Sequence, residues 1–308
     1  MPSISVIIPL YNKEKFIEKT LKSALEQTFS DFEVLIVDDG STDKSASVVK
    51  SFNDERIRFF SKENEGVSAT RNFGIDKSEG KFIAFLDADD YWHPTFLETI
   101  FALTKEFPNE KVFASAIEIE TNGIILPAIY SIPKNEKPQI VDFFEGSHRQ
   151  CVLFTSSTMF EKTIFEKTGK FDTSLKTDED TDLWIRIGLE NAVVFSYKIG
   201  ARYIFDSKGL SKSKKEIAQK TTFSNYLKLE KTNFKLQKFL NRHRFSIALK
   251  CKIYNLNEDF ERFYSLIDKN ALSRKQRILI ALPSFALKKI YGLKLFLQQR
   301  KIRFSAHN

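Results

Sequence analysis

The chain has 308 residues, of which 42% are hydrophobic and 29% charged, so a wholly disordered protein is excluded and one large domain with an appendage is expected. The net charge of +8 is uneven, because residues 241–308 hold 15 Lys/Arg against 4 Asp/Glu. Cys151 and Cys251 lack metal-ligand spacing and are expected to be reduced thiols. The chain starts in a predicted strand without a basic leader, and no apolar run reaches the about 18 residues of a spanning helix. We therefore expect no signal peptide and a cytoplasmic location.

The N-terminal part of the chain alternates short apolar strands with helical periods. Strands are predicted at residues 4–9, 32–37, 56–61 and 82–86, with helices at residues 13–27, from a cap at Ser41 or Thr42 to residue 52, and from a cap at Ser68 onward. Strands that alternate with helices in this way form right-handed βαβ units. The pattern predicts a doubly wound α/β half, with the loops after the first, second and fourth strands facing one crevice.

Residues 94–211 continue this pattern less regularly. They predict a helix at 94–107, a strand at 112–120, an aperiodic insertion with three prolines at 121–149, an extended segment at 152–160, a helix capped by Asp182 at 182–189, and two strands at 193–197 and 201–205. The following residues have helical periods at 223–239 and 245–266, and then apolar clusters interrupted by Lys and Arg at 277–304. They predict a basic, helical appendage.

The apolar run at residues 82–86 stops at three carboxylates, Asp87, Asp89 and Asp90. A run without polar alternation is typical of a strand that is buried on both faces, and its end opens into the crevice where α/β sheets bind ligands. Asp87 and Asp89 point the same way from an extended turn, and carboxylates held this close call for a neutralising partner such as a divalent cation. The alternative is a solvated acidic turn that caps the helix after Pro94.

Six segments, taken in order, resemble the family-2 glycosyltransferases, which have the GT-A fold. The segments are SVIIPLYNKEKFI (5–17), FEVLIVDDGSTDKS (32–45), ENEGVSATRNFGI (63–75), FIAFLDADD (82–90), FD (171–172) and EDTDLWIRI (179–187). The resemblance covers about residues 3–211. It implies a GT-A domain with a doubly wound mixed sheet over residues 1–211, and it leaves residues 212–308 as a basic helical C-terminal region.

The resemblance also implies that a nucleotide-sugar donor, expected to be UDP-linked, binds in the crevice. The residues implied for donor binding are Pro9, Tyr11, Asp38, Asp39, Arg71, Asp87 and Ala88. Tyr11 would stack on the base, Asp39 would accept a base N–H, and the guanidinium of Arg71 would contact diphosphate oxygens. The alternatives that need no ligand are a turn and helix cap at the two adjacent aspartates and a surface position for Arg71.

A metal-dependent transfer with inversion is implied by the same resemblance. Asp89 is expected to ligate Mn²⁺ or Mg²⁺ directly, and Asp87 to bind the metal or the ribose. Asp206 stands where the family often has a Tyr-Arg-x-His segment, and it is a third candidate ligand. Asp180 is expected to be the catalytic base, with Glu179 orienting the acceptor or the base.

The acceptor side of the reaction is the least determined by the sequence. We expect transfer to a hydroxyl of a glycan or a lipid-linked acceptor in surface polysaccharide biosynthesis, and Trp184 is open between an acceptor-site residue and a core residue. The basic stretch at 277–304 suits peripheral contact with the anionic inner face of a membrane, and the alternative is a packed helical subdomain with a solvated rim. Nucleic acid is not an expected partner, since no binding motif accompanies the charge. The alternative function is a non-catalytic nucleotide-sugar-binding or scaffold protein of the same fold.

Overall fold

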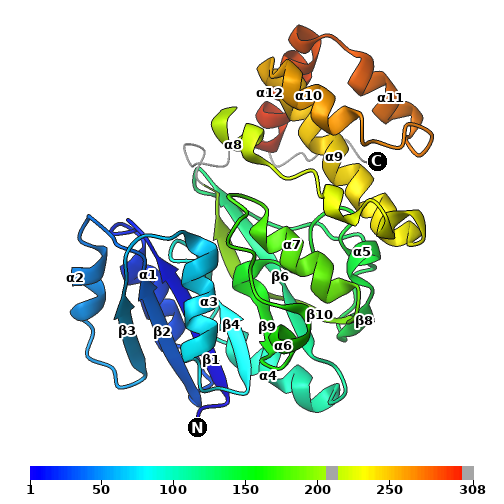
Figure 1. The fold of residues 1–308 in the computed structure, drawn as a ribbon. Coiled ribbons are helices and arrows are strands. Elements are labelled where there is room, and N and C mark those ends of the chain that lie inside the picture. Colours follow the sequence, from blue (N-terminus) through cyan, green and yellow to red (C-terminus); the bar gives the residue numbers. More distant parts are fainter. Residues whose placement is uncertain (206–213, 300–308) are drawn as a thin grey trace. The chain divides into compact units, whose positions relative to one another are not determined.

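The computed structural model describes residues 1–205 and 214–299, with side chains as far as Leu293. The chain divides into two compact units, Met1–Phe205 and Asp206–Asn308. The first unit holds a large sheet and the second is helical (Figure 1). The boundary expected between residues 211 and 212, and the candidate metal ligand Asp206, both lie outside the described residues.

The first unit is built on a mixed sheet with the strand order β3-β2-β1-β4-β9-β6-β10-β5, to which β7 adds beside β6 and β8 beside β10. Strands β1 to β4 are parallel, as their alternation with helices predicts, and β9 then pairs antiparallel with both β4 and β6. The expected α/β fold with a mixed sheet is therefore confirmed. The strands are β1 (Ile4–Leu10), β2 (Phe32–Asp38), β3 (Ile57–Ser61), β4 (Phe82–Phe85), β5 (Tyr91–Trp92), β6 (Val112–Thr121), β7 (Ile124–Pro127), β8 (Gln139–Val141), β9 (Thr158–Glu161) and β10 (Val193–Ile204).

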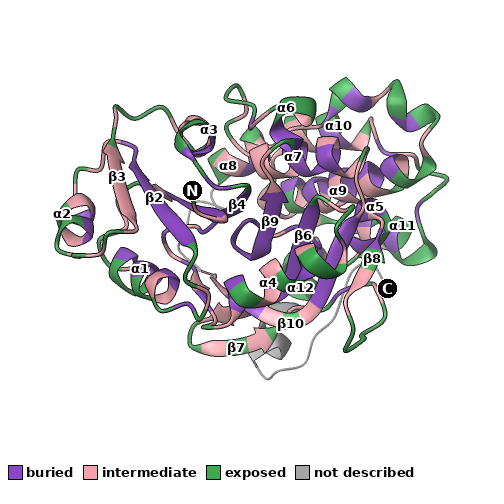
Figure 2. Cartoon of the chain, turned by 90° about the horizontal axis from the view of Figure 1, so that it is seen from below, coloured by how far each residue is buried: buried purple, intermediate pink, exposed green. Residues whose placement is uncertain are grey.

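Helices cover both faces of this sheet, with α1 and α4 on one side and α3, α6 and α7 on the other (Figure 2). Every residue of β2 and β4 is buried, as expected for strands that are covered on both faces, whereas the edge strand β3 is only partly buried. The helices are α1 (Ile17–Leu25), α2 (Ser45–Lys50), α3 (Val67–Lys77), α4 (Phe96–Glu106), α5 (Phe143–Gly146), α6 (Ile164–Thr168) and α7 (Glu179–Gly188), with a 3₁₀ turn at Thr155–Ser157.

The predicted hydroxyl caps of α2 and α3 are wrong. α2 begins at Ser45, and Ser41 and Thr42 lie in the loop before it, where they bond to the loop after β1. The N-cap of α3 is Gly66 at φ 91°, a conformation that suits glycine, so Ser68 lies inside the helix. A hydroxyl near a helix start is a cap only where the backbone turns at that residue, and tertiary bonds move this point.

The cap predicted at Asp182 is also wrong, because α7 begins three residues earlier at Glu179. Asp182 lies in the first turn and pairs with Arg186 at 2.8 Å, a spacing of four residues along the helix. Trp184 is a core residue, since it is 1% exposed and its ring stacks on Phe160 with centroids 5.1 Å apart.

The two strands predicted at 193–197 and 201–205 form the single strand β10, which pairs with β6 through register shifts between Ser196 and Ala201. Gly200 lies in this irregular part, and a Cβ there would come within 2.3 Å of Ser115 Oγ and 2.4 Å of the Phe96 ring. A glycine that permits close packing interrupts the apolar period, so one bulged strand has the sequence pattern of two. The insertion at 121–149 is partly ordered into β7, β8 and α5.

The second unit is a helical cluster around α9. The sequence predicts separate helical periods at 223–239 and 245–266, whereas α9 continues as one helix through the residues between them. Arg244 lies at its centre, 2% exposed, and its guanidinium contacts Glu230 at 2.9 Å. No helix in the described part of the chain is long and apolar enough to cross a membrane. The helices are α8 (Lys214–Gln219), α9 (Phe234–Tyr254), α10 (Asn257–Tyr264), α11 (Arg274–Ala281) and α12 (Ser284–Gln299), with 3₁₀ turns at Ser224–Tyr226 and Leu229–Lys231.

Candidate functional site

The predicted site residues follow three neighbouring strands at the point where each strand ends. Tyr11 follows β1, Asp38 ends β2, and Asp87 comes two residues after β4. Leu10 and Asp38 are paired in register, and β4 pairs with the other side of β1. Because the carboxyl ends of parallel strands meet at one edge of a sheet, these loops lie together at the edge where α/β sheets bind ligands.

The loops after β1 and β2 are joined by hydrogen bonds into one unit. Asn12, at φ 51°, donates its N–H to Ser41 Oγ at 3.0 Å, and its side-chain oxygen accepts the Thr42 N–H at 2.8 Å. The Lys13 N–H donates to Ser45 Oγ at 2.7 Å. These bonds fix the backbone at Asn12 and Lys13, directly after Tyr11.

Tyr11 and Asp39 differ sharply in exposure. Tyr11 is 47% exposed, as a ring that stacks on a ligand must be. Asp39 is 3% exposed, and its carboxylate accepts from Lys62 Nζ at 2.5 Å and from the N–H groups of Glu65 at 3.0 Å and Gly66 at 2.8 Å. Burial raises the pKa of Asp39, but these hydrogen bonds outweigh it and the pKa is lowered. The Thr70 side chain is a further donor that lowers this pKa, so the carboxylate is held ionised by donors of the protein itself.

Asp38, Pro9 and Ala88 have mainly structural contacts at this edge. Asp38 is 3% exposed and accepts from the Ser41 N–H at 3.2 Å and the Ser61 hydroxyl at 3.3 Å, which is the turn expected without a ligand. Pro9 is half-buried within β1. The carbonyl of Ala88 accepts from the Thr20 hydroxyl at 3.0 Å, and this bond anchors the acidic turn to α1.

The three carboxylates of the acidic turn after β4 differ in how far they are buried. Asp87 and Asp89 are partly exposed, with side chains at 29% and 31%, whereas Asp90 is 1% exposed. Asp90 accepts from the Ser156 hydroxyl at 2.6 Å and from the Ile204 N–H at 3.1 Å. Burial, reinforced by the charges of Asp87 and Asp89, raises the pKa of Asp90 well above its ordinary value. Asp90 therefore holds the turn from its buried side, while Asp87 and Asp89 remain partly exposed.

Arg71 lies between the acidic turn and the acidic start of α7. Its Nη2 contacts Asp87 at 2.7 Å and its Nη1 contacts Glu179 at 3.1 Å, and the guanidinium lies 5.2 Å from the ring centre of Phe171. Arg71 is 4% exposed, so a surface arginine is excluded. Burial lowers the pKa of Arg71, but the charges of Asp87 and Glu179 outweigh it and keep the guanidinium ionised.

The position of Arg71 depends on a second link between the same elements. The side-chain amide of Asn72 donates to the Phe171 carbonyl at 2.8 Å and accepts the Phe171 N–H at 3.0 Å. This pair of bonds holds α3 against the segment before α7. It sets the distance from Arg71 to Glu179.

The acidic pair of α7 shows two different environments. The Glu179 side chain is 15% exposed, and burial together with the charge of Asp180 raises its pKa even though Arg71 acts in the opposite direction. Asp180 is half-buried and accepts from the Thr181 N–H at 2.5 Å and the Thr181 hydroxyl at 3.1 Å. Both carboxylates lie in the first turn of the helix, where the helix dipole stabilises negative charge.

Three residues of this edge were not predicted: Lys13, which contacts Asp89, Lys62, which contacts Asp39, and Ser156, which contacts the acidic turn. The two lysines are surface-type residues in polar loops, and no local pattern separates them from other lysines. Ser156 lies in the run of four hydroxyl residues at 155–158, which was the available signal. Its hydroxyl also accepts the Asp87 N–H at 3.1 Å, and its carbonyl accepts the Trp92 indole N–H at 2.6 Å.

Among the described residues, no three His, Cys, Asp or Glu side chains are placed to hold one metal ion. Asp87 and Asp89 are two oxygen donors on one turn, partly exposed and each beside a cation. Mg²⁺ and Mn²⁺ commonly use one or two carboxylates and complete their shell with water and substrate phosphates. The pair therefore fits an ion that binds together with a diphosphate.

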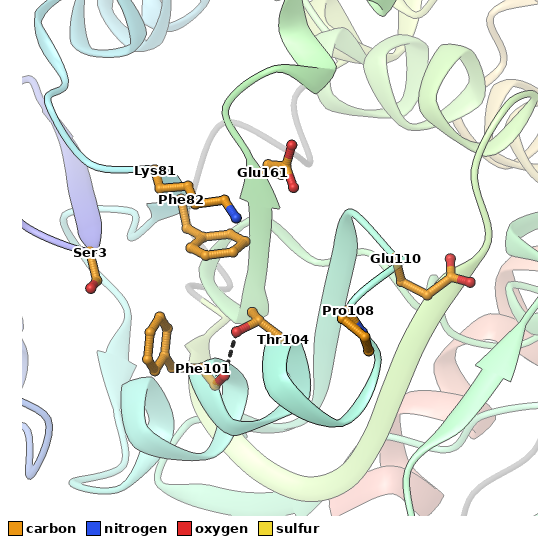
Figure 3. A pocket seen from close by; sticks show the side chains of 8 residues that line it. All are labelled: Ser3, Lys81, Phe82, Phe101, Thr104, Pro108, Glu110 and Glu161. Carbon is orange, nitrogen blue, oxygen red and sulfur yellow. Dashed lines mark hydrogen bonds between the residues drawn. The ribbon is translucent and has the colours of Figure 1, made fainter.

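A hollow of about 260 Å³ opens at the opposite end of the strands (Figure 3). Ser3 precedes β1 and Lys81 precedes β4, so the hollow is at the other edge of the sheet from the acidic turn. It contains none of the predicted site residues. Its lining residues are Ser3, Lys81, Phe82, Phe101, Thr104, Pro108, Glu110 and Glu161.

The strand order and the acidic residues at the carboxyl edge of the sheet define the GT-A class of fold. The structure of S. aureus TarS 1–349 in complex with UDP-GlcNAc resembles this chain with a TM-score of 0.66 at 22% identity, covering 95% of this chain and 92% of that one. The model of the family described as glycosyl transferase family 2 matches residues 5–169, more than half of the chain. The chain belongs to this family.

Two relatives show how much of the chain is shared. A Rickettsia felis protein described as an uncharacterized glycosyltransferase is 36% identical over 197 residues, which are 62% of this chain and 31% of that protein. Glycosyltransferase GlyA of Streptococcus pneumoniae is 39% identical over 106 residues, 34% of this chain and 15% of that protein. The match thus spans about a third or less of the length of these relatives.

Proposed function

We propose that this chain transfers a sugar from a UDP-sugar, with inversion, to a hydroxyl of a glycan or lipid-linked acceptor in surface polysaccharide biosynthesis. The observation that carries the proposal is the position of Arg71, which contacts Asp87 of the acidic turn and Glu179 of the acidic pair. One buried guanidinium thus joins the carboxylate expected at the leaving diphosphate to the carboxylate expected at the acceptor. The reacting carbon would lie between them.

The donor binds at the ends of β1 and β2 in this proposal. The exposed ring of Tyr11 offers a stacking face, and the ionised carboxylate of Asp39 would accept a base N–H in place of one of its present donors. The TarS neighbour was solved with UDP-GlcNAc, which supports a UDP-sugar as the donor class. Arg71 shares its charge between two carboxylates, and we propose that one of these contacts is exchanged for diphosphate oxygens when the donor binds.

Asp89 and Asp87 would hold a divalent ion, Mn²⁺ or Mg²⁺, against the diphosphate. When bound, such an ion neutralises the charge that develops on the leaving nucleoside diphosphate. Asp90 keeps the turn in place through Ser156 and does not reach the crevice. The chain's own contribution is therefore to hold two carboxylate oxygens on a rigid turn.

Asp180 accepts the proton in this mechanism. As the acceptor hydroxyl oxygen forms its bond to the anomeric carbon, the carbon–oxygen bond to the diphosphate breaks, the UDP leaves with the electron pair, and the hydroxyl proton passes to the Asp180 carboxylate. Among the described residues, the hydrogen bonds to the Asp180 carboxylate come from Thr181 and both reach Oδ1, so Oδ2 remains available. Glu179, held by Arg71, orients the acceptor.

The experiment is release of nucleoside diphosphate from a panel of UDP- and GDP-sugars with Mn²⁺, on wild type, Asp180→Asn and the exposed control Glu166→Gln. We expect Asp180→Asn to lose turnover by about 10²–10⁴-fold while its melting temperature still rises with UDP and Mn²⁺, and the control to match wild type. Thermal stabilisation of all three proteins without turnover of any donor, even with glycan acceptors added, would favour the non-catalytic binding protein.

A further inference from the structure

Helix α12 turns an apolar and basic face outward. Phe285, Lys288, Lys289 and Leu293 lie at spacings of three, four and eight residues, which place them on one side of the helix. Phe285 is 67% and Leu293 58% exposed, whereas Leu287 on the opposite side is 3% exposed. The helix therefore packs through Leu287 and presents an aromatic ring, a leucine and two ammonium groups to its surroundings.

Helix α11 repeats this arrangement on a shorter length. Arg274, Arg277 and Ile278 lie on one side, with Ile278 56% exposed, and the buried side holds Gln276 and Ile280 at 7% each. We call the outward residues of α12 the basic apolar face; they are Phe285, Lys288, Lys289 and Leu293.

The charge of this face is not balanced within its own sequence. From residue 269 to residue 308 the chain has ten Lys/Arg and no Asp/Glu. Within the described part of the chain, Lys288 and Lys289 make no ion pair with an acidic side chain. An isolated exposed apolar residue is ordinary, but large apolar side chains placed between unpaired cations on one helix face indicate a partner that is both apolar and anionic.

We propose that the basic apolar face binds peripherally to a bilayer that contains anionic lipids. Such a surface offers phosphates to the two Lys groups and hydrocarbon to the Phe and Leu side chains at a slightly greater depth. Nucleic acid would satisfy the cations and leave the apolar side chains in water. This inference goes beyond the transfer reaction and stands whether or not the crevice is catalytic.

The test is co-sedimentation of the full chain with vesicles, without donor or metal, so that it is independent of the proposed transfer. Phosphatidylcholine vesicles containing phosphatidylglycerol should bind the wild type, pure phosphatidylcholine should bind it much less, and raising the salt from about 0.1 M to about 0.5 M should weaken binding. The paired variants Lys288→Glu/Lys289→Glu and Phe285→Ser/Leu293→Ser should each bind at least about tenfold more weakly.

Matched controls separate the face from general effects. Lys134→Glu/Lys137→Glu changes two exposed lysines of the first unit by the same charge, and Phe234→Ser removes a ring that is 72% exposed on α9. Both should bind vesicles like wild type, and circular dichroism should show all variants folded. The proposal is overturned if the wild type does not bind anionic vesicles. It is also overturned if the serine pair binds like wild type, or if the serine pair changes only the oligomeric state.

Discussion

The ammonium of Lys13 lies 2.5 Å from Oδ2 of Asp89, the carboxylate that we propose as a ligand of a divalent ion. Both side chains are about one-third exposed, at 37% and 31%. The Lys13 backbone is fixed by its bond to Ser45, but its side chain has four rotatable bonds and can leave. Lys13 and a metal ion that binds the same oxygen of Asp89 would therefore compete for it.

Replacing this lysine should therefore tighten metal binding. We expect Lys13→Met to bind Mn²⁺ about fivefold more tightly than wild type, because an exposed ion pair is worth up to about 1 kcal/mol. A titration that follows free Mn²⁺ by electron paramagnetic resonance measures this directly. Lys15→Met changes the net charge equally from an exposed position nearby, and equal affinities of the two variants would contradict the competition.

Arg71 should be a major source of stability for the crevice. We expect Arg71→Met to lower the free energy of unfolding, measured in urea, by about 3–5 kcal/mol, because the substitution leaves Asp87 and Glu179 without their shared partner. The exposed pair of Lys22 with Glu18 is the comparison, since both side chains are more than half exposed. Lys22→Met should change the unfolding free energy much less, and equal losses in both variants would show that burial of the Arg71 pair does not matter.

Asp39 should make stability depend on pH in the acidic range. Its pKa is lower in the folded chain than in the unfolded chain, so its stabilising contribution is present above the unfolded value of about 4 and is lost as the pH falls through the folded value. Asp39→Asn should be less stable than wild type at neutral pH, and the difference should narrow below about pH 4. Urea unfolding at several pH values measures this, and a gap that widened in acid would oppose the prediction.

Ser156 should matter more than its neighbour Ser157. Ser156→Ala removes the hydroxyl that donates to buried Asp90 and accepts the Asp87 N–H. We expect the free energy of unfolding to fall by about 1–3 kcal/mol, because these groups lose their hydrogen-bond partner. The hydroxyl of Ser157 makes a longer bond of 3.3 Å to the Phe154 carbonyl, so Ser157→Ala is the matched control. Chemical denaturation of both variants should show a clear loss only for Ser156→Ala.

The local pattern of the sequence determined the elements that carry the crevice. Apolar runs of period two or without alternation identified β1 to β4, and the abrupt change to carboxylates after residue 86 located the acidic turn. These signals are readable because strand burial and turn polarity are expressed by residues next to one another in the chain. Helix starts and the continuity of β10 were predicted wrongly, since both depend on how a segment packs against others.

Only the tertiary structure decided which groups the site residues contact. Arg71 meets Asp87 and Glu179, which are 16 and 108 positions away in the chain, and Lys13 meets Asp89 across 76 positions. The sequence around a charged residue on a helix or in a loop does not identify its ion-pair partner, because the same residue type is equally compatible with a solvent-exposed position. The sequence by itself thus determined the edge of the sheet where the candidate site residues lie, and folding determined how their charges are paired, since those contacts join residues that are far apart in the chain.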